Sequence, residues 1–275
     1  MQATVQAVSE TKPLAEIERV LDFVPCANTA PKKLTPDQIG RFNRDGGLAP
    51  LDVFSSSEME HHRANFDRML EIAQREGKDS YSVNGWHTRY AELYDLVTEP
   101  RVLAYVRDLI GEDFLCWGSH YFCKLPGDTK AVSWHQDAVY WPFSHSRTVT
   151  VWLAIDDADP ENGCMQVLPG SHRHGPMKHG QSGEAEKNVL WLTAQGVDRF
   201  GKPVDTVLKA GQIGIHSDML LHSSPPNPSA RRRCGLTMRY CPPSVKPYNG
   251  WGGRGILCSG EDRYGYWKYP PRPQE

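Results

Sequence analysis

Apolar positions recur with a helical period through the N-terminal part of the chain. Thr35 and Pro36 predict the N-cap and first turn of a short helix in LTPDQIGRFNRDG, which a glycine ends. Residues 56–76 predict a second helix, with the apolar side chains gathered on one side. A third helix is predicted over 90–111, and we expect a break near Pro100 because proline cannot continue the hydrogen-bond ladder.

From there the pattern changes to short stretches rich in β-branched and aromatic residues, separated by Gly, Pro, Asn and Asp. These predicted strands are FLCWGSHYFCKL, RTVTVWLAI, CMQVLPG, NVLWL, PVDTVLKAG, QIGIHS and CGLTMRY. Many short strands with regular turn signals are typical of an antiparallel sandwich or barrel. The fold class predicted from the pattern is therefore mainly β with flanking helices.

The length of 275 residues fits one large β-rich domain better than two small ones. We expect residues 1–15 to be flexible and residues 16–112 to be mostly helical. The β core is predicted over 113–240. Residues 241–275 mix prolines and glycines with tyrosines and tryptophans, which predicts an irregular aromatic tail packed on the core.

Charge and cysteine usage exclude several function classes. The 31 basic and 33 acidic residues leave a formal charge of -2, so nucleic acid is not an expected partner. Seven cysteines without a C-x-x-C pair argue against a zinc ribbon and a disulfide framework, and favour the cytoplasm. No stretch predicts a signal peptide or a membrane span, so we expect no membrane partner. The partner that we expect is a small-molecule substrate. The oligomeric state stays open.

The stretch SWHQDAVYW puts an ionisable pair in an aromatic setting. A strand over 134–138 would point His135 and Asp137 to the same face, so both could bind one metal ion. A third ligand is needed, and either His216 or His222 could supply it, because each ends an apolar stretch in the segment 210–240.

Two histidines and a carboxylate form a facial triad that leaves three coordination positions open and indicates non-haem Fe(II). Zinc would more often be tetrahedral with one open position. Arg233 opens the predicted strand CGLTMRY eleven positions after His222, and its guanidinium suits the far carboxylate of a 2-oxo acid. His135, Asp137, His222 and Arg233 therefore describe one predicted site.

These residues resemble the phytanoyl-CoA dioxygenase family of Fe(II)/2-oxoglutarate oxygenases. The resemblance rests on LTPDQIGRFNRDG, WHQD, VTVWLAIDDADPENGCMQVLPGSHRHG and LLHSSPPNPSARRRCGLTMRY, and covers most of the chain. It implies a double-stranded β-helix, or jelly roll, in a single oxygenase domain over 1–275, with Fe(II), 2-oxoglutarate and O2 as cofactor and cosubstrates. It also implies iron ligands at His135, Asp137 and His222. The implied cosubstrate contacts are Arg233, Ser224 and Trp152.

The same resemblance suggests the reaction. Halogenases of this fold replace the carboxylate ligand with Ala or Gly; because Asp137 is present, hydroxylation is favoured. Donors near the metal strand predict a small anionic or zwitterionic substrate, and the contacts we expect are His120, Tyr121, Lys124, Tyr140 and Trp141. Bacterial family members that hydroxylate 2-aminoethylphosphonate next to phosphorus look similar, which makes that compound the leading candidate and phosphonate catabolism the expected context.

Three alternatives stay open. A hydroxylase or desaturase of a secondary-metabolite scaffold would use the same site, with the aromatic tail as a lid. A non-catalytic jelly-roll module would bind a metal or ligand only. A zinc or manganese enzyme without redox chemistry would use the same three ligands, although Arg233 would then have no evident purpose.

Overall fold

The computed structural model describes residues 11–183 and 187–275. Most of the segment 1–15, predicted to be flexible, lies outside these ranges; within it, Leu14 begins a short 3-10 helix, Leu14–Glu16. No helix in the described ranges is long and apolar enough to cross a membrane. All seven cysteines lie in these ranges and are free.

The predicted helices are present, and their capping groups set where they begin. Helix α1 spans Pro36–Asp45 and starts with a reciprocal capping box between Thr35 and Gln38. The long helix α2, Ser56–Arg75, starts with the same arrangement one residue earlier, at Ser55. The third predicted helix is split as expected into α3, Ala91–Val97, and α4, Pro100–Ile110.

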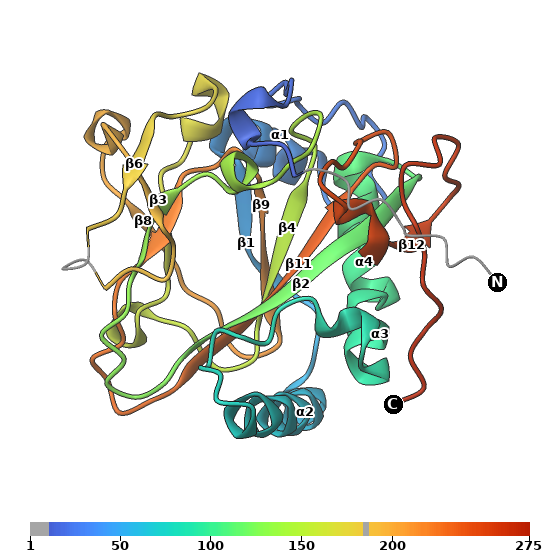
Figure 1. Cartoon of the computed structure of the whole chain (residues 1–275). Coiled ribbons are helices and arrows are strands. Elements are labelled where there is room, and N and C mark those ends of the chain that lie inside the picture. The colour runs from blue at the N-terminus through green and yellow to red at the C-terminus, as the bar shows by residue number, and fades with distance from the viewer. Residues whose placement is uncertain (1–10, 184–186) are drawn as a thin grey trace.

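Ten strands form two main antiparallel sheets that face each other (Figure 1). The large sheet has the order β1-β9-β4-β11-β2-β12, with bounds Gly47–Asp52, Gln212–Ser217, Val149–Ala154, Arg233–Cys241, Phe114–Lys124 and Ile256–Ser259. The small sheet has the order β3-β10-β5-β8, with bounds Val132–His135, His222–Ser224, Met165–Val167 and Val204–Thr206. A separate hairpin pairs β6, His179–Gln181, with β7, Leu192–Ala194.

From β2 to β11, successive strands of the two sheets cross from one sheet to the other except β5 and β8, which pair within the small sheet; this is the connectivity of a jelly roll. The long helices pack against the outer face of the large sheet, and the small sheet lies across its inner face (Figure 1). The predicted fold class is therefore confirmed.

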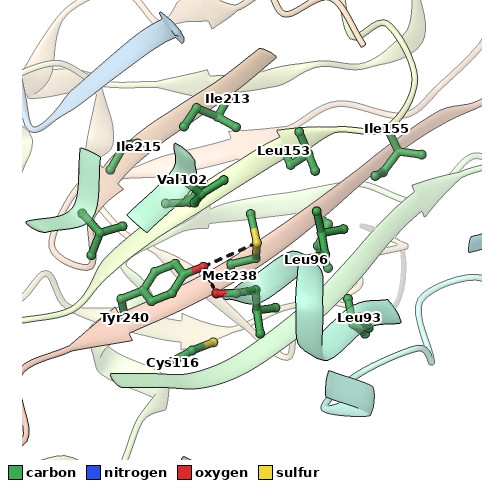
Figure 2. Packing of buried hydrophobic residues seen from close by; sticks show 14 of the residues in the cluster. Leu93, Leu96, Val102, Cys116, Leu153, Ile155, Ile213, Ile215, Met238 and Tyr240 are labelled. Carbon is green, nitrogen blue, oxygen red and sulfur yellow. Dashed lines mark hydrogen bonds between the residues drawn. The ribbon is translucent and has the colours of Figure 1, made fainter. Parts of the chain in front are cut away.

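Side chains of β11 alternate strictly between these two faces. Leu236, Met238 and Tyr240 are fully buried in the main hydrophobic cluster. Figure 2 shows Met238 and Tyr240 on the same side as residues of α3, α4, β4 and β9, and the Tyr240 hydroxyl donates a hydrogen bond to a carbonyl of α3. The opposite set, which includes Arg233 and Arg239, faces the space between the sheets.

Two strands lie outside the region predicted as the β core, and one predicted strand is largely absent. Strand β1 lies inside the region predicted to be mostly helical, and Pro50 disguised it; a proline is tolerated there because β1 is an edge strand. The tail contributes the edge strand β12, which pairs with β2. The predicted strand NVLWL belongs to a named strand only at its last residue, Leu192; its first residue, Asn188, forms an isolated bridge with Ala131, and its side chain binds Ser133 and the backbone of Leu190.

Gly235 allows the inner face of β11 to accept a large neighbour. A Cβ atom at this position would overlap the indole of Trp152 on β4. We therefore expect Gly235→Ala to lower the free energy of unfolding by about 1–3 kcal/mol through overpacking. Chemical denaturation measures this, with Gly253→Ala as the control because nothing lies within 4 Å of a Cβ there. Equal stability of the two variants would contradict the packing described for Trp152.

Candidate active site

The metal-ligating pair comes from the end of a strand, not from its middle. Strand β3 stops at His135, and Asp137 begins a 3-10 helix, Asp137–Tyr140, so the predicted strand over 134–138 is wrong in its second half. Gln136 draws the chain out of the sheet, because its amide donates to the carbonyls of Gly175 and Met219. Its backbone remains extended, which leaves the side chains before and after it on the same side.

His222 reaches the same place from the neighbouring strand. It is the first residue of β10 and lies directly opposite His135 in the β3–β10 pairing. One nitrogen of each histidine and one oxygen of Asp137 all lie within 4.8 Å of one another. The Asp137 Oδ1 atom is 3.6 Å from Nε2 of His135 and 4.0 Å from Nε2 of His222. All three side chains are buried.

Backbone carbonyls orient both histidines. Nδ1 of His135 lies 2.8 Å from the Ser133 carbonyl, and Nδ1 of His222 lies 2.9 Å from the Leu220 carbonyl. Each Nδ1 therefore carries the proton, and each Nε2 is left with a lone pair directed at the common point. Histidines that bind metals are oriented in this way, so the donor set fits a divalent transition metal.

Asp137 is kept ionised for the same role. Burial alone would raise the pKa of this carboxyl, but the imidazole rings of His135 and His216 beside it and the positive charge of Arg239 nearby hold the pKa well below its usual range. Its second oxygen, Oδ2, accepts a hydrogen bond of 3.1 Å from the Thr150 hydroxyl. This leaves Oδ1 for the metal.

His216, the alternative third ligand, lies on the other side of Asp137. Its Nε2 is 3.8 Å from Oδ2, the oxygen that Thr150 also contacts, and it is not part of the three-residue group. Both of its ring nitrogens are buried without a hydrogen-bond partner among the described residues. The places of the two rings relative to Asp137 therefore favour His222 as the third metal ligand. His216 is a neighbour of the Asp137 carboxylate.

The side chains expected at the cosubstrate end line the same cavity as the metal ligands. The guanidinium of Arg233 is 2% exposed and donates to the Gly163 carbonyl at 2.9 Å and the Ser224 hydroxyl at 3.2 Å. It lies 5.7 Å from the ring of Trp152. All of these partners are neutral, so the positive charge of Arg233 has no counter-charge within ion-pair distance among the described residues.

Two of the expected substrate contacts lie elsewhere. Tyr121 is buried in the hydrophobic core, with its ring 4.6 Å from that of Phe66. It points away from the cavity because neighbouring residues of a strand face opposite sides, and His120 and Phe122 take the inner side. Lys124 is fully buried and donates to the Lys130 carbonyl; burial, and then the charge of Arg233, lower its pKa to about 7.

The remaining expected contacts line a second cavity of about 630 Å³ that opens beside the metal ligands. His120, Tyr140 and Trp141 belong to its wall, and it shares His135, Asp137 and Arg239 with the first cavity. Sequence reasoning missed Arg239 as well as Asn84, Trp117 and Arg254, which also line this cavity. The alternation of CGLTMRY contained a signal for Arg239, since residues 233 and 239 of one strand share a face.

A comparison with known families fits this geometry. Residues 42–235 match the family described as Phytanoyl-CoA dioxygenase (PhyH). The chain belongs to the phytanoyl-CoA dioxygenase family. The predicted family is thus confirmed, whereas its narrower likeness to 2-aminoethylphosphonate hydroxylases stays a prediction.

Individual relatives are distant. This family member is 29% identical over 155 residues to the peroxisomal phytanoyl-CoA dioxygenase of Bos taurus, across 54% of this chain and 46% of that protein. It is 28% identical over 172 residues to a probable alpha-ketoglutarate-dependent hypophosphite dioxygenase of Stutzerimonas stutzeri, across 62% of this chain and 59% of that protein. The chain spans about half the length of these curated relatives. The apo structure of the non-heme monooxygenase ThoJ aligns with a TM-score of 0.71 and 27% identity, across 86% of this chain and 88% of that one.

The two buried histidines near Asp137 provide a matched test of the metal site. We expect His222→Ala to weaken Fe(II) binding more than about 100-fold, since losing a group that only orients a ligand already costs about 10–100-fold. His216→Ala should keep Fe(II) affinity within about tenfold, because its ring lies beside the other carboxylate oxygen without a hydrogen bond that would orient it. Anaerobic calorimetry measures both. The opposite order would assign the third ligand to His216.

Proposed function

We propose that this chain is a non-haem Fe(II)- and 2-oxoglutarate-dependent oxygenase that hydroxylates a C–H bond of a small polar substrate. The observation that carries the proposal is the pairing, in one cavity, of two histidines and a carboxylate with a buried arginine that lacks an acidic partner. A metal site alone would not need such an arginine. A dicarboxylic acid that chelates the metal needs both the metal site and an arginine for its far carboxylate.

The types of ligand atom indicate which role each residue would have. His135, Asp137 and His222 would hold Fe(II) and leave positions open for ligands. Bound Fe(II) with 2-oxoglutarate supplies the oxidising power, because oxidative decarboxylation of the 2-oxo acid to succinate and carbon dioxide activates dioxygen. The protein's own contribution is to position the reactants and keep water out.

Arg233 would bind the far carboxylate of 2-oxoglutarate. Its guanidinium is planar and permanently charged, and such a group forms strong paired hydrogen bonds to carboxylates. Hydrogen bonds to the Gly163 carbonyl and the Ser224 hydroxyl hold it in place, and Trp152 closes one wall. Burial makes the unpaired charge costly in the free protein, which favours binding of a compensating anion.

Hydroxylation suits this ligand set better than halogenation or simple binding. Asp137 occupies the position that a halide would need, and the Thr150 hydrogen bond holds it there. A binding module or a zinc enzyme would leave Arg233 and its cavity unexplained.

We propose 2-aminoethylphosphonate as the first substrate to test, with hydroxylation at the carbon next to phosphorus. The larger cavity offers polar groups to a zwitterion, including the Asn84 amide and the ion pair of Lys130 with Asp79 at 2.8 Å. A relative is named for another phosphorus oxyanion, hypophosphite. This similarity supports a phosphorus acid without identifying one.

A secondary-metabolite scaffold is the second candidate. The cavity of about 630 Å³ is much larger than 2-aminoethylphosphonate needs and has the size of sites for drug-like molecules. Four tryptophans line it, and three of them form a single aromatic group: the ring of Trp117 lies 4.6 Å from that of Trp141 and 5.8 Å from that of Trp251. Aromatic walls of this kind favour a ring-bearing substrate.

Arg233→Met tests the cosubstrate assignment. We expect it to weaken 2-oxoglutarate binding about 10- to 100-fold, which is the effect of losing a hydrogen bond to a charged group at a buried site. Anaerobic titration with Fe(II) and 2-oxoglutarate measures this through the visible metal-to-ligand charge-transfer band. The control is Arg231→Met, two residues earlier, because Arg231 is exposed and pairs with Asp159. An unchanged band in Arg233→Met would refute the assignment.

Succinate release identifies the substrate. The protein is loaded with Fe(II) and 2-oxoglutarate and exposed to air in the presence of each candidate substrate. The amounts of succinate and of hydroxylated product are then measured and compared. We expect 2-aminoethylphosphonate to raise the rate at least about tenfold over the uncoupled reaction if it fills the reactive position. If it has no effect while an aromatic scaffold accelerates release, the second candidate replaces the first. If no 2-oxoglutarate binds, the oxygenase proposal itself fails.

A further inference from the structure

Arg239 is a second buried arginine without an acidic partner. It lines both cavities, is 9% exposed, and makes no ion pair within 4.0 Å in the part of the chain that the structure describes. Its Nε atom is buried and has no hydrogen-bond partner among those residues. The rings of Trp117 and Trp141 lie 5.7 and 5.5 Å from its guanidinium, and the charge of Asp137 acts on it from beyond ion-pair distance.

The contacts of Arg239 within the protein do not satisfy all of its hydrogen-bond donors. Aromatic rings stabilise a guanidinium, but they leave its in-plane N–H groups without acceptors, and a buried donor without an acceptor is costly. Arg233 differs, since backbone and hydroxyl oxygens already satisfy part of its donor set. An oxyanion in the larger cavity would satisfy Arg239 in the same way.

The position of Arg239 separates it from the cosubstrate end. It lies six residues from Arg233 on the same face of β11, which puts about 20 Å between the two Cα atoms. In the sheet it faces Thr150 of β4, the residue whose hydroxyl contacts Asp137. The metal ligands therefore lie between the two arginines. A dicarboxylic acid that chelates the metal and extends to Arg233 points away from Arg239.

The charge balance of the smaller cavity also calls for another anion. Among its described lining residues Asp137 is the acid, and Arg233 and Arg239 are the two permanently charged bases. The charges of Fe(II) and of 2-oxoglutarate would cancel each other, and Asp137 compensates one arginine. One positive charge then has no partner inside a buried site.

We propose that Arg239 binds an oxyacid group of the substrate, so that this enzyme oxidises organic acids, either carboxylates or phosphonates. The inference deepens the proposed function and rests on it. The anion anchors one end of the substrate beside the Asp137 edge of the metal site, and the tryptophans that flank Arg239 exclude water from the pair. Neutral scaffolds are then poor substrates, whatever their size.

The test uses two small probes, methylphosphonate and acetate, on the full chain loaded with Mn(II) and 2-oxoglutarate. Mn(II) is paramagnetic and accepts the same nitrogen and oxygen donors, so it accelerates nuclear relaxation of a probe held beside the metal site. We expect at least one probe to show this effect, and Arg239→Met to weaken its binding at least tenfold. The probe that binds more tightly distinguishes a phosphonate from a carboxylate substrate.

The control is Arg263→Met, which removes the same charge from an exposed position that lines neither cavity. It should leave probe binding within about twofold, because an exposed charge is screened by solvent. Calorimetry of 2-oxoglutarate binding should also stay within about twofold in Arg239→Met. If Arg239→Met does not fold, Arg239→Lys replaces it; a lysine keeps the charge but loses the paired hydrogen bonds, and should weaken probe binding several-fold.

Three results overturn the inference. Absence of probe relaxation in the wild type means that no anion site exists beside the metal. Equal relaxation in the wild type and Arg239→Met means that another group binds the anion. A tenfold loss of 2-oxoglutarate affinity in Arg239→Met would assign Arg239 to the cosubstrate. Failure of the wild type to bind 2-oxoglutarate is a different outcome, and it contradicts the proposed function rather than the role of Arg239.

Discussion

The alternation of side chains along the large sheet is the constraint on which the rest of the structure depends. On β11, Leu236 and Met238 face the helices while Arg233 and Arg239 face the cavities. A register slip of one residue would exchange these sets, burying two guanidinium groups in the hydrophobic core. The apolar contacts with the helices therefore hold the charged groups in position around the candidate metal ligands.

The inner face of the large sheet carries buried charged side chains that a bound ligand could neutralise. Asp137 is compensated by its neighbours, but Arg233 and Arg239 lack acidic partners within ion-pair distance in the described part of the chain. Such groups lower the stability of the free protein and are stabilised when an anion binds. The large apolar core offsets this cost. Ligand binding and folding are linked through the same few residues.

Family membership explains part of this arrangement. The matched segment, 42–235, includes the three candidate metal ligands and Arg233, and it ends before Arg239. The cavity beyond the metal is lined by residues from distant parts of the chain, among them Asn84, Trp141 and Trp251. Identity to known relatives is below one third throughout these comparisons. The substrate is therefore better sought in the chemistry of this cavity than in the name of any relative.

The sequence alone determined the local features. Capping residues such as Thr35 predicted where helices begin, the two-residue period predicted the main strands, and the spacing of His135, Asp137 and Arg233 predicted the chemistry. Only the tertiary structure decided which faces point inward. The side chain of Tyr121 lies in the hydrophobic core, and that of Arg239 lines the cavity. His222, rather than His216, lies within ligating distance of His135 and Asp137. The physical reason is that periodicity shows which residues share a face, whereas pairing between strands far apart in sequence decides what that face meets.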